Sequence, residues 1–315
     1  MKRGFLILGI FILLTFVYAG SFSDSSVGDF NQGTYNNTFY NGSAVVLSGT
    51  NLTGNFTSRI FDAGASARWD NLSWTGNQSN FTEIFAVDAQ GKVYSSSDSG
   101  ATWTLRNSSY GRTSDTQTMF SDSNGNLYII TNSNREIWRS SDSGVTWTII
   151  NNSFASNDLF AATADLNNNL YVIAGQSLGI VFKSNDSGVT WTQVNNSYNG
   201  GNGVAKGMTV NKSNSIFAVD AQGKVYSSSD SGATWILRNS GYGRTSDTQD
   251  MFSDSNGNLY IITNDNREIW KSSNSGISWT RVNNSFASND LFAATADLNN
   301  NLYVIAGQSL GVVFK

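Results

Sequence analysis

An eight-residue pattern recurs along this chain at a constant spacing, and it limits the folds that the chain can adopt. The stretch SSDSGATW occupies residues 96–103 and returns letter for letter at 228–235. Close copies begin at Ser140, Ser184 and Ser272, so the Asp or Asn position falls at 98, 142, 186, 230 and 274, always 44 residues apart. Repeats of this length are typical of solenoids and propellers, in which each unit packs against its neighbours.

The chain also has a longer repeat that contains several of these 44-residue units. Residues 84–183 match residues 216–315 with about eleven differences, at an offset of 132 residues, which is three times 44. Three units have therefore been duplicated as one block, with little divergence since.

Within one unit the pattern predicts four short strands. In the third unit they fall at 159–165, 170–175, 180–186 and 190–196, rich in β-branched and aromatic residues between Gly- or Asn-rich turns. No window has the 3.6-residue apolar period of a helix together with helix caps. Four antiparallel strands in such a unit form one blade of a β-propeller. We therefore predict an all-β propeller of about six four-stranded antiparallel blades.

The pattern S-x-D-x-G-x-x-W resembles the Asp-box, or BNR repeat, of sialidase-like, sortilin-like and photosystem II assembly factor-like propellers. The resemblance covers about residues 70–315 and implies the propeller fold, but this fold hosts many functions and implies no single activity. In this family the box is the hairpin between the third and fourth strands of a blade, on the rim. The box residues here are Asp98, Gly100, Trp103, Asp142, Gly144, Trp147, Asp186, Gly188, Trp191, Asp230, Gly232, Trp235, Asn274, Gly276 and Trp279.

The chemistry of the box favours a structural role over a catalytic one. An aspartate can accept backbone N–H groups of its own turn, a glycine can adopt a positive φ, and a tryptophan can anchor the hairpin between blades. Asn274 replaces the aspartate in the fifth box. An Asx turn tolerates that change, whereas an acid catalyst would not.

The repeats place six blades at 70–107, 116–151, 158–196, 204–239, 249–283 and 290–315. The sixth blade can be followed to residue 315, just before the position at which its box would begin. We expect an N-terminal strand, at 44–48 or 56–61, to complete this blade; the alternative is that further blades follow in a longer chain.

The N-terminus predicts export. Lys2 and Arg3 precede an apolar run from Gly4 to Val17, and Val17-Tyr18-Ala19 is a plausible cleavage site. We interpret residues 1–19 as a secretory signal peptide, with no membrane span beyond it, and expect a secreted or cell-surface protein; the alternative is that this segment is an uncleaved anchor. Residues 20–69 carry no box and are interpreted as a β-rich N-terminal extension.

Composition excludes several kinds of site. The chain has no cysteine and no histidine, which removes thiolate metal sites, the commonest general base and the Ser-His-Asp triad. The net charge is −4 and no basic stripe is visible, so we expect no nucleic-acid partner. We also expect no cofactor, no metal and no catalytic set.

A ligand site is expected on the face that carries the blade-to-blade connections and the second-to-third strand turns, which we call the connection face. Its most polar candidates are Tyr110, Arg112 and Asp115, with the copies Tyr242, Arg244 and Asp247 across the axis. The alternative is that Arg112 and Asp115 pair with each other or cap the next strand. The neighbouring charges of Arg135-Glu136 and Arg267-Glu268 are expected to be exposed on hairpins.

Three functions remain open. The first is a secreted or surface propeller that binds glycans or proteins, because two nearly identical halves suit repeated weak contacts. The second is a glycoside hydrolase of sialidase-like type, although the Arg-Ile-Pro motif usual in sialidases is absent. A xyloglucanase-like hydrolase would need two carboxylates facing across a cleft, for which Asp115 and Asp247 are conceivable partners. The third is a structural module without a ligand.

Overall fold

The protein is described by a computed structural model. The structure describes residues 83–154, 157–176, 178–201, 203–286, 290–307 and 312–315, together with the backbone of six short strands between residues 9 and 75. The chain divides into two compact units, residues 2–80 and 81–315. The domain boundaries predicted at 19/20 and 69/70 remain predictions.

The first unit contains three two-stranded antiparallel sheets. Strand β1 (Gly9–Ile12) pairs with β6 (Leu72–Thr75), β2 (Thr34–Asn36) with β5 (Asn55–Thr57), and β3 (Thr38–Tyr40) with β4 (Val45–Leu47). Apart from the backbone of β1, the predicted signal peptide lies outside the described residues.

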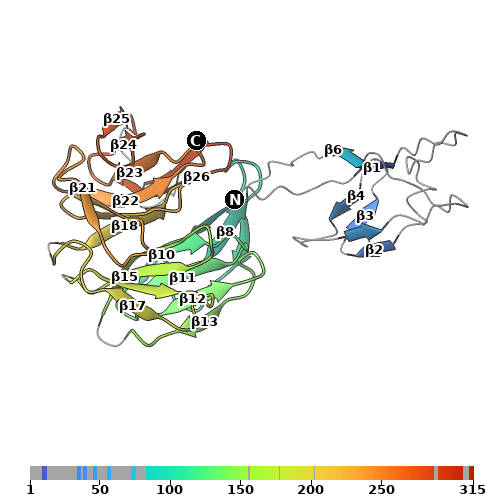
Figure 1. Cartoon of the computed structure of the whole chain (residues 1–315), viewed down its shortest axis with the longest axis horizontal. Helices are drawn as coiled ribbons and strands as arrows, with labels where there is room; N and C mark the ends of the chain where they lie inside the picture. Colours follow the sequence, from blue (N-terminus) through green and yellow to red (C-terminus); the bar gives the residue numbers. More distant parts are fainter. Residues whose placement is uncertain are drawn as a thin grey trace, which may run out of the picture. The chain divides into compact units, whose positions relative to one another are not determined.

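The second unit is a six-bladed, all-β propeller, as predicted (Figure 1). Four blades have four antiparallel strands and are formed by β10–β13, β14–β17, β18–β21 and β22–β25; three described strands form each of the first and sixth blades, β7–β9 and β26–β28. The strands of the first three blades are β7 (Ile84–Val87), β8 (Val93–Ser96), β9 (Thr104–Asn107), β10 (Thr116–Ser121), β11 (Leu127–Thr131), β12 (Ile137–Ser140), β13 (Thr148–Asn151), β14 (Leu159–Ala164), β15 (Leu170–Ala174), β16 (Ile180–Ser184) and β17 (Thr192–Asn195). Those of the last three are β18 (Ala205–Val210), β19 (Ile216–Asp220), β20 (Val225–Ser228), β21 (Ile236–Asn239), β22 (Thr248–Ser253), β23 (Leu259–Thr263), β24 (Ile269–Ser272), β25 (Thr280–Asn283), β26 (Leu291–Ala296), β27 (Leu302–Ala306) and β28 (Val312–Phe314).

The second strand of each complete blade lies in the core. All five residues of β11, β15, β19 and β23 are buried, because both faces of the sheet are covered by neighbouring blades. These strands therefore read as continuous apolar runs such as LYIIT and LYVIA instead of alternating patterns. The fourth strands lie on the rim, and their first two residues are exposed in every case.

The ring closes between the sixth blade and the first. A Cβ added to Gly100, in the first box, would lie 3.4 Å from Val313 Cγ1 and 3.9 Å from Tyr303 Cδ1 of the sixth blade. Gly232 of the fourth blade packs in the same way on Val181 and Tyr171 of the third. In Figure 1 the teal β8 and the red β26 accordingly lie in neighbouring parts of the ring.

The expected completion of the sixth blade by an N-terminal strand is wrong for the residues that the structure describes. Strand β28 pairs with β27 alone. Strand β4 lies within the candidate segment 44–48 and pairs with β3, and β5 overlaps the candidate segment 56–61 at residues 56–57 and pairs with β2. Residues 58–61 lie outside the described residues. Both strands are only three residues long, and strand propensity does not identify a partner, so local sequence could not select between these pairings.

The box turns have a single geometry. In the second box, Asp142 Oδ1 accepts the Thr146 backbone N–H at 2.9 Å, Ser140 Oγ accepts the Gly144 N–H at 2.9 Å, and Trp147 Nε1 donates to the Gly144 carbonyl at 3.1 Å. Gly144 has φ +80°, and Ser143 before it has φ +57°. The left-handed serine was not anticipated, but two successive positive φ values explain why the turn is so narrow.

The fifth box keeps this turn with different donors. Asn274 Oδ1 accepts the Ser278 N–H at 2.9 Å, and Asn274 Nδ2 donates to Ser278 Oγ at 2.8 Å. In the other boxes a threonine hydroxyl instead donates to the aspartate, as Thr102 does to Asp98 at 2.5 Å. This hydrogen bond, with others in the turn, lowers the pKa of Asp98 to about 2. The aspartates therefore act as ionised acceptors for their own turns.

Candidate functional site

On the connection face, the predicted residue Arg112 belongs to a hydrogen-bond network around a buried glutamate, Glu136. Glu136 is 6 % exposed; it accepts from Arg112 in a bidentate pair, with Arg112 Nε at 2.8 Å from Oε2 and Nη2 on Oε1. Trp138 Nε1 donates to the same carboxylate at 3.0 Å. The arginine hydrogen bond lowers the pKa of Glu136, so the carboxylate is ionised at neutral pH.

Tyr110 lies beneath this network. Its side chain is buried and its hydroxyl is 2.9 Å from Thr116 Oγ1. The ring packs edge-on against Trp138 at 5.5 Å between centroids and is tilted against the box residue Trp147 at 6.1 Å. Burial raises the pKa of Tyr110. Tyr110 therefore supports the connection from below and is not open to a ligand.

Asp115 has a different task from Arg112. Its carboxylate accepts the backbone N–H groups of Ser133 at 2.9 Å and Asn134 at 2.7 Å, and Asn134 Nδ2 at 2.8 Å. Asp115 itself has φ +74°. The alternative that Arg112 and Asp115 pair with each other is wrong, because each binds a separate part of the β11–β12 hairpin.

The same arrangement recurs in the fifth blade. Arg244 binds Glu268 through two hydrogen bonds of 2.8 and 2.6 Å, and Asp247 accepts the backbone N–H groups of Asp265 and Asn266. Tyr242 is buried. Arg281, which stands where the second blade has Ile149, adds a third cation contact to Glu268 at 2.8 Å. These hydrogen bonds lower the pKa of Glu268 to about 2, with Arg244 as the largest cause.

The expectation that Glu136 and Glu268 are exposed hairpin charges is wrong. Both are buried acceptors, whereas Arg135 and Arg267 beside them reach the next blade and pair with Asp158 and Asp290. The connection face therefore presents two stiff loop assemblies, in blades that lie opposite each other in a six-bladed ring. Between the braced residues stand short exposed segments, Thr113-Ser114 and Thr245-Ser246.

The box turns are in contact with the connections between blades. Trp191, Trp235 and Trp279 pack on Phe154, Tyr198 and Tyr242 as Trp147 does on Tyr110. The asparagine that ends a fourth strand also donates to a backbone carbonyl of the next box turn. These bonds are Asn107 to Val145, Asn151 to Val189, Asn195 to Ala233 and Asn239 to Ile277. The strong twist of each blade brings its outer strand to its neighbour.

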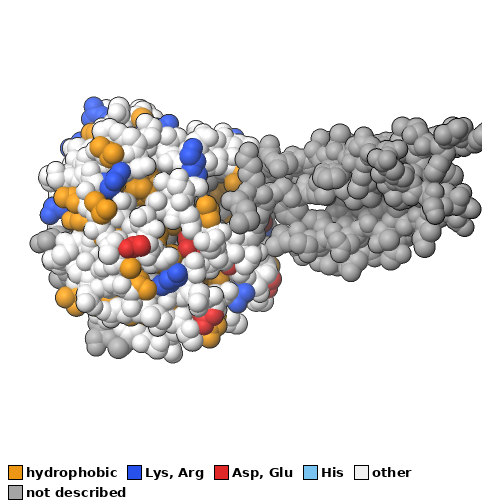
Figure 2. All heavy atoms as spheres, in the orientation of Figure 1, with side chains coloured by type: hydrophobic (Ala, Val, Ile, Leu, Met, Phe, Trp, Pro, Cys, Tyr) orange, Lys and Arg blue, Asp and Glu red, His pale blue; other side chains and the backbone are white. Residues whose placement is uncertain are grey.

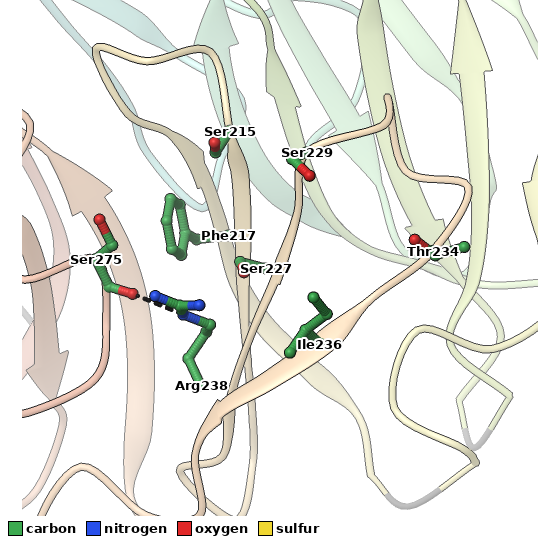
Figure 3. Close-up of a pocket in the computed structure, with 8 residues that line it drawn as sticks. All are labelled: Ser215, Phe217, Ser227, Ser229, Thr234, Ile236, Arg238 and Ser275. Carbon is green, nitrogen blue, oxygen red and sulfur yellow. Dashed lines mark hydrogen bonds between the residues drawn. The ribbon is translucent and has the colours of Figure 1, made fainter.

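A second candidate site lies on the rim of the fourth blade and was missed by sequence reasoning. It is a cavity of about 190 Å³ lined by Ser215, Phe217, Ser227, Ser229, Thr234, Ile236, Arg238 and Ser275. Figure 3 shows Arg238 extending toward the fifth blade, where its Nε donates to the Ser275 carbonyl at 3.1 Å. We call it the rim pocket.

The rim pocket exists because one filling side chain is absent from the fourth blade. In the third and fifth blades a lysine of the third strand covers a second-strand tyrosine, Lys183 over Tyr171 and Lys271 over Tyr260, at 5.7 and 5.5 Å. In the fourth blade the corresponding cross-strand pair is Ser227 and Phe217. A serine is too short to cover the ring, so the space above it stays open. A comparison of cross-strand pairs between repeats could have found this signal.

No group of three or more metal-ligating side chains is present among the described residues. Within the same residues, no helix is long and apolar enough to cross a membrane. The face in Figure 2 is mainly uncharged, with blue and red side chains scattered over it.

The comparison with protein-family models supports the propeller fold. A family model described as "DUF6242 beta propeller domain" matches residues 63–199. No curated protein matches the chain. The solved structure titled "YCF48 bound to D1 peptide" is similar over 72 % of this chain and 72 % of its own, with 18 % identity and a TM-score of 0.48. The D1 peptide in that title is bound to YCF48.

Proposed function

We propose that this chain is an exported β-propeller that binds a glycan or protein partner through its connection face. The observation that carries the proposal is the duplicated assembly of Arg112, Glu136 and Asp115 in the second blade and of Arg244, Glu268 and Asp247 in the fifth. Each assembly fixes its loops through charged hydrogen bonds, which are stronger than neutral ones.

Two physical consequences favour binding. A loop that is rigid before binding loses little conformational entropy when a partner docks, so weak polar contacts can give measurable affinity. Two equal sites on one rigid ring can also engage a repetitive partner together, which raises the apparent affinity by about 10²–10⁴-fold without any new contact. A polysaccharide or an oligomeric protein would offer such a repeat.

The test uses exposed positions that do not take part in the bracing. Ser114→Arg and Ser246→Arg, alone and together, add bulk to the two loops; the full chain is screened on a glycan array and against purified surface proteins, and hits are quantified by biolayer interferometry. We expect each single variant to weaken binding to a multivalent partner and the double variant to abolish it. A chain without a partner at millimolar concentration, or a double variant that binds normally, contradicts the proposal.

Export is tested separately. The intact mass of protein recovered from the producing cells should correspond to a chain that begins after Ala19. A mature chain that keeps residues 1–19 would refute a cleaved signal peptide.

A further inference from the structure

We propose that the rim pocket of the fourth blade binds the carboxylate of an acidic sugar residue, a uronic acid. The site shares no residue with the connection-face network, so this inference goes beyond the proposed function and does not depend on it.

The anion-binding group is Arg238. Its Nε is held by the Ser275 carbonyl of the next blade, which fixes the plane of the guanidinium. Among the described residues, nothing accepts from its two terminal amino groups, and the side chain lines the cavity. A guanidinium fixed in this way matches the two oxygens of a carboxylate.

The remaining lining favours a hydroxylated ligand. Ser215, Ser227 and Ser229 contribute hydroxyl groups that can donate or accept. The Thr234 hydroxyl already donates to Asp230 at 2.6 Å, so what it can offer a ligand is an acceptor. A sulfate ion brings acceptors only, and a phosphate ion at neutral pH carries at most two hydroxyl groups on a single small tetrahedron. A sugar acid brings a carboxylate for Arg238 and several ring hydroxyl groups, one of which can donate to Thr234.

The size of the pocket agrees with one sugar ring. Its volume of about 190 Å³ is below the ~300 Å³ at which pockets for drug-sized molecules begin. Phe217 is 2 % exposed and forms an apolar floor, while Ile236, 61 % exposed, forms an open wall. A terminal or internal residue of a longer polyuronate chain could enter from this side.

The duplicated half of the chain supplies a natural comparison. At the offset of 132 residues, the first blade repeats the aromatic floor and the arginine, with Phe85 and Arg106, and Arg106 Nε donates to the Ser143 carbonyl at 3.0 Å. Among the lining positions it differs at two, because Glu83 stands in place of Ser215 and Thr104 in place of Ile236. The Glu83 carboxylate would repel an anion, so of these two blades the fourth is the one that fits an acidic sugar.

The experiment titrates the full chain with glucuronate and galacturonate, using saturation-transfer NMR and calorimetry. Glucose, acetate and inorganic phosphate serve as probes that carry only part of the chemistry. We expect the two uronates to bind with dissociation constants on the order of millimolar and the three control probes to bind at least tenfold more weakly. Equal binding of acetate or phosphate, equal binding of glucose, or no uronate binding would overturn the proposal.

Four variants locate the site. Ser227→Lys introduces the side chain that fills this place in the third and fifth blades, and Ser215→Glu introduces the residue of the first blade; both should reduce uronate binding at least tenfold. Arg238→Gln removes the anion-binding group and should also reduce uronate binding at least tenfold. Arg106→Gln, at the matched position of the first blade, is its control and should leave binding unchanged. Thermal unfolding of each variant verifies the fold. Uronate binding that survives Ser227→Lys in a folded protein refutes the assignment.

Discussion

Replacing Asp250 with threonine should stabilise the propeller at neutral and alkaline pH and have little effect in acid. Asp250 lies in the innermost strand of the fifth blade, β22, and it is one of the few positions at which the duplicated halves differ, because Thr118 is its counterpart. Burial raises its pKa from 3.8 to about 7, although the backbone N–H groups of Met251 and Ala294 favour the charged form.

The direction in which Asp250 changes stability with pH follows from proton linkage. Because the folded state holds this proton more strongly than the unfolded chain, stability is greatest below the unfolded pKa of 3.8 and is lost as the pH rises from 3.8 to about 7. A shift of about 3 pKa units corresponds to about 4 kcal/mol as an upper limit. The Asp250 side chain is only partly buried, and the water that reaches it screens the charge, so we expect about 2 kcal/mol.

The assay is thermal and urea unfolding of wild type and Asp250→Thr at pH 3.5 and pH 8, followed by tryptophan fluorescence. At pH 8 the variant should unfold about 4–8 °C higher, and at pH 3.5, below the unfolded pKa of 3.8, the difference should be much smaller. Thr118→Asp, at the matched position of the second blade, should introduce a similar pH-dependent loss. An effect of Asp250→Thr that is equal at both pH values would refute the reasoning.

Substitutions at three further positions test other parts of the structure. Glu268→Gln removes an ionised acceptor whose pKa is lowered from 4.5 to about 2, so it should lower the free energy of unfolding by about 2 kcal/mol at pH 7. Urea titrations at several pH values should show this difference from wild type shrinking as the pH falls from 4.5 toward 2. Asn151→Ala removes the side-chain bond to the next box turn and should lower stability by about 1 kcal/mol. Asp142→Asn should be tolerated, as Asn274 is in the fifth box, whereas Asp142→Ala should cost about 1–2 kcal/mol by leaving turn N–H groups unpaired; comparison of their melting temperatures decides the point.

The sixth blade illustrates where sequence reasoning stops. The strand candidates at 44–48 and 56–61 have suitable composition, but β4 and β5 pair within residues 2–80. Strand propensity describes how well a segment suits a sheet and does not identify its partner. The number of blades could be predicted, because it depends on counting repeats and not on choosing partners.

In the candidate site, too, the sequence identifies residues whose partners only the structure identifies. The repeats direct attention to Tyr110, Arg112 and Asp115 as a group, yet the partner of Arg112 is Glu136, 24 residues away on the next hairpin. The rim pocket depends on Ser227 facing Phe217 across two strands and on Arg238 reaching Ser275 of another blade. Neither juxtaposition is a short-range pattern, so both required the ring to be assembled.

The amino-acid sequence by itself determined the repeat, the strand order within a blade and the box turn, because the hydrogen bonds of that turn join residues no more than four apart. Tertiary structure alone decided which charges are buried, which loops brace one another and where a cavity remains. These depend on contacts between neighbouring hairpins and blades, whose mutual twist and spacing only the closed ring sets.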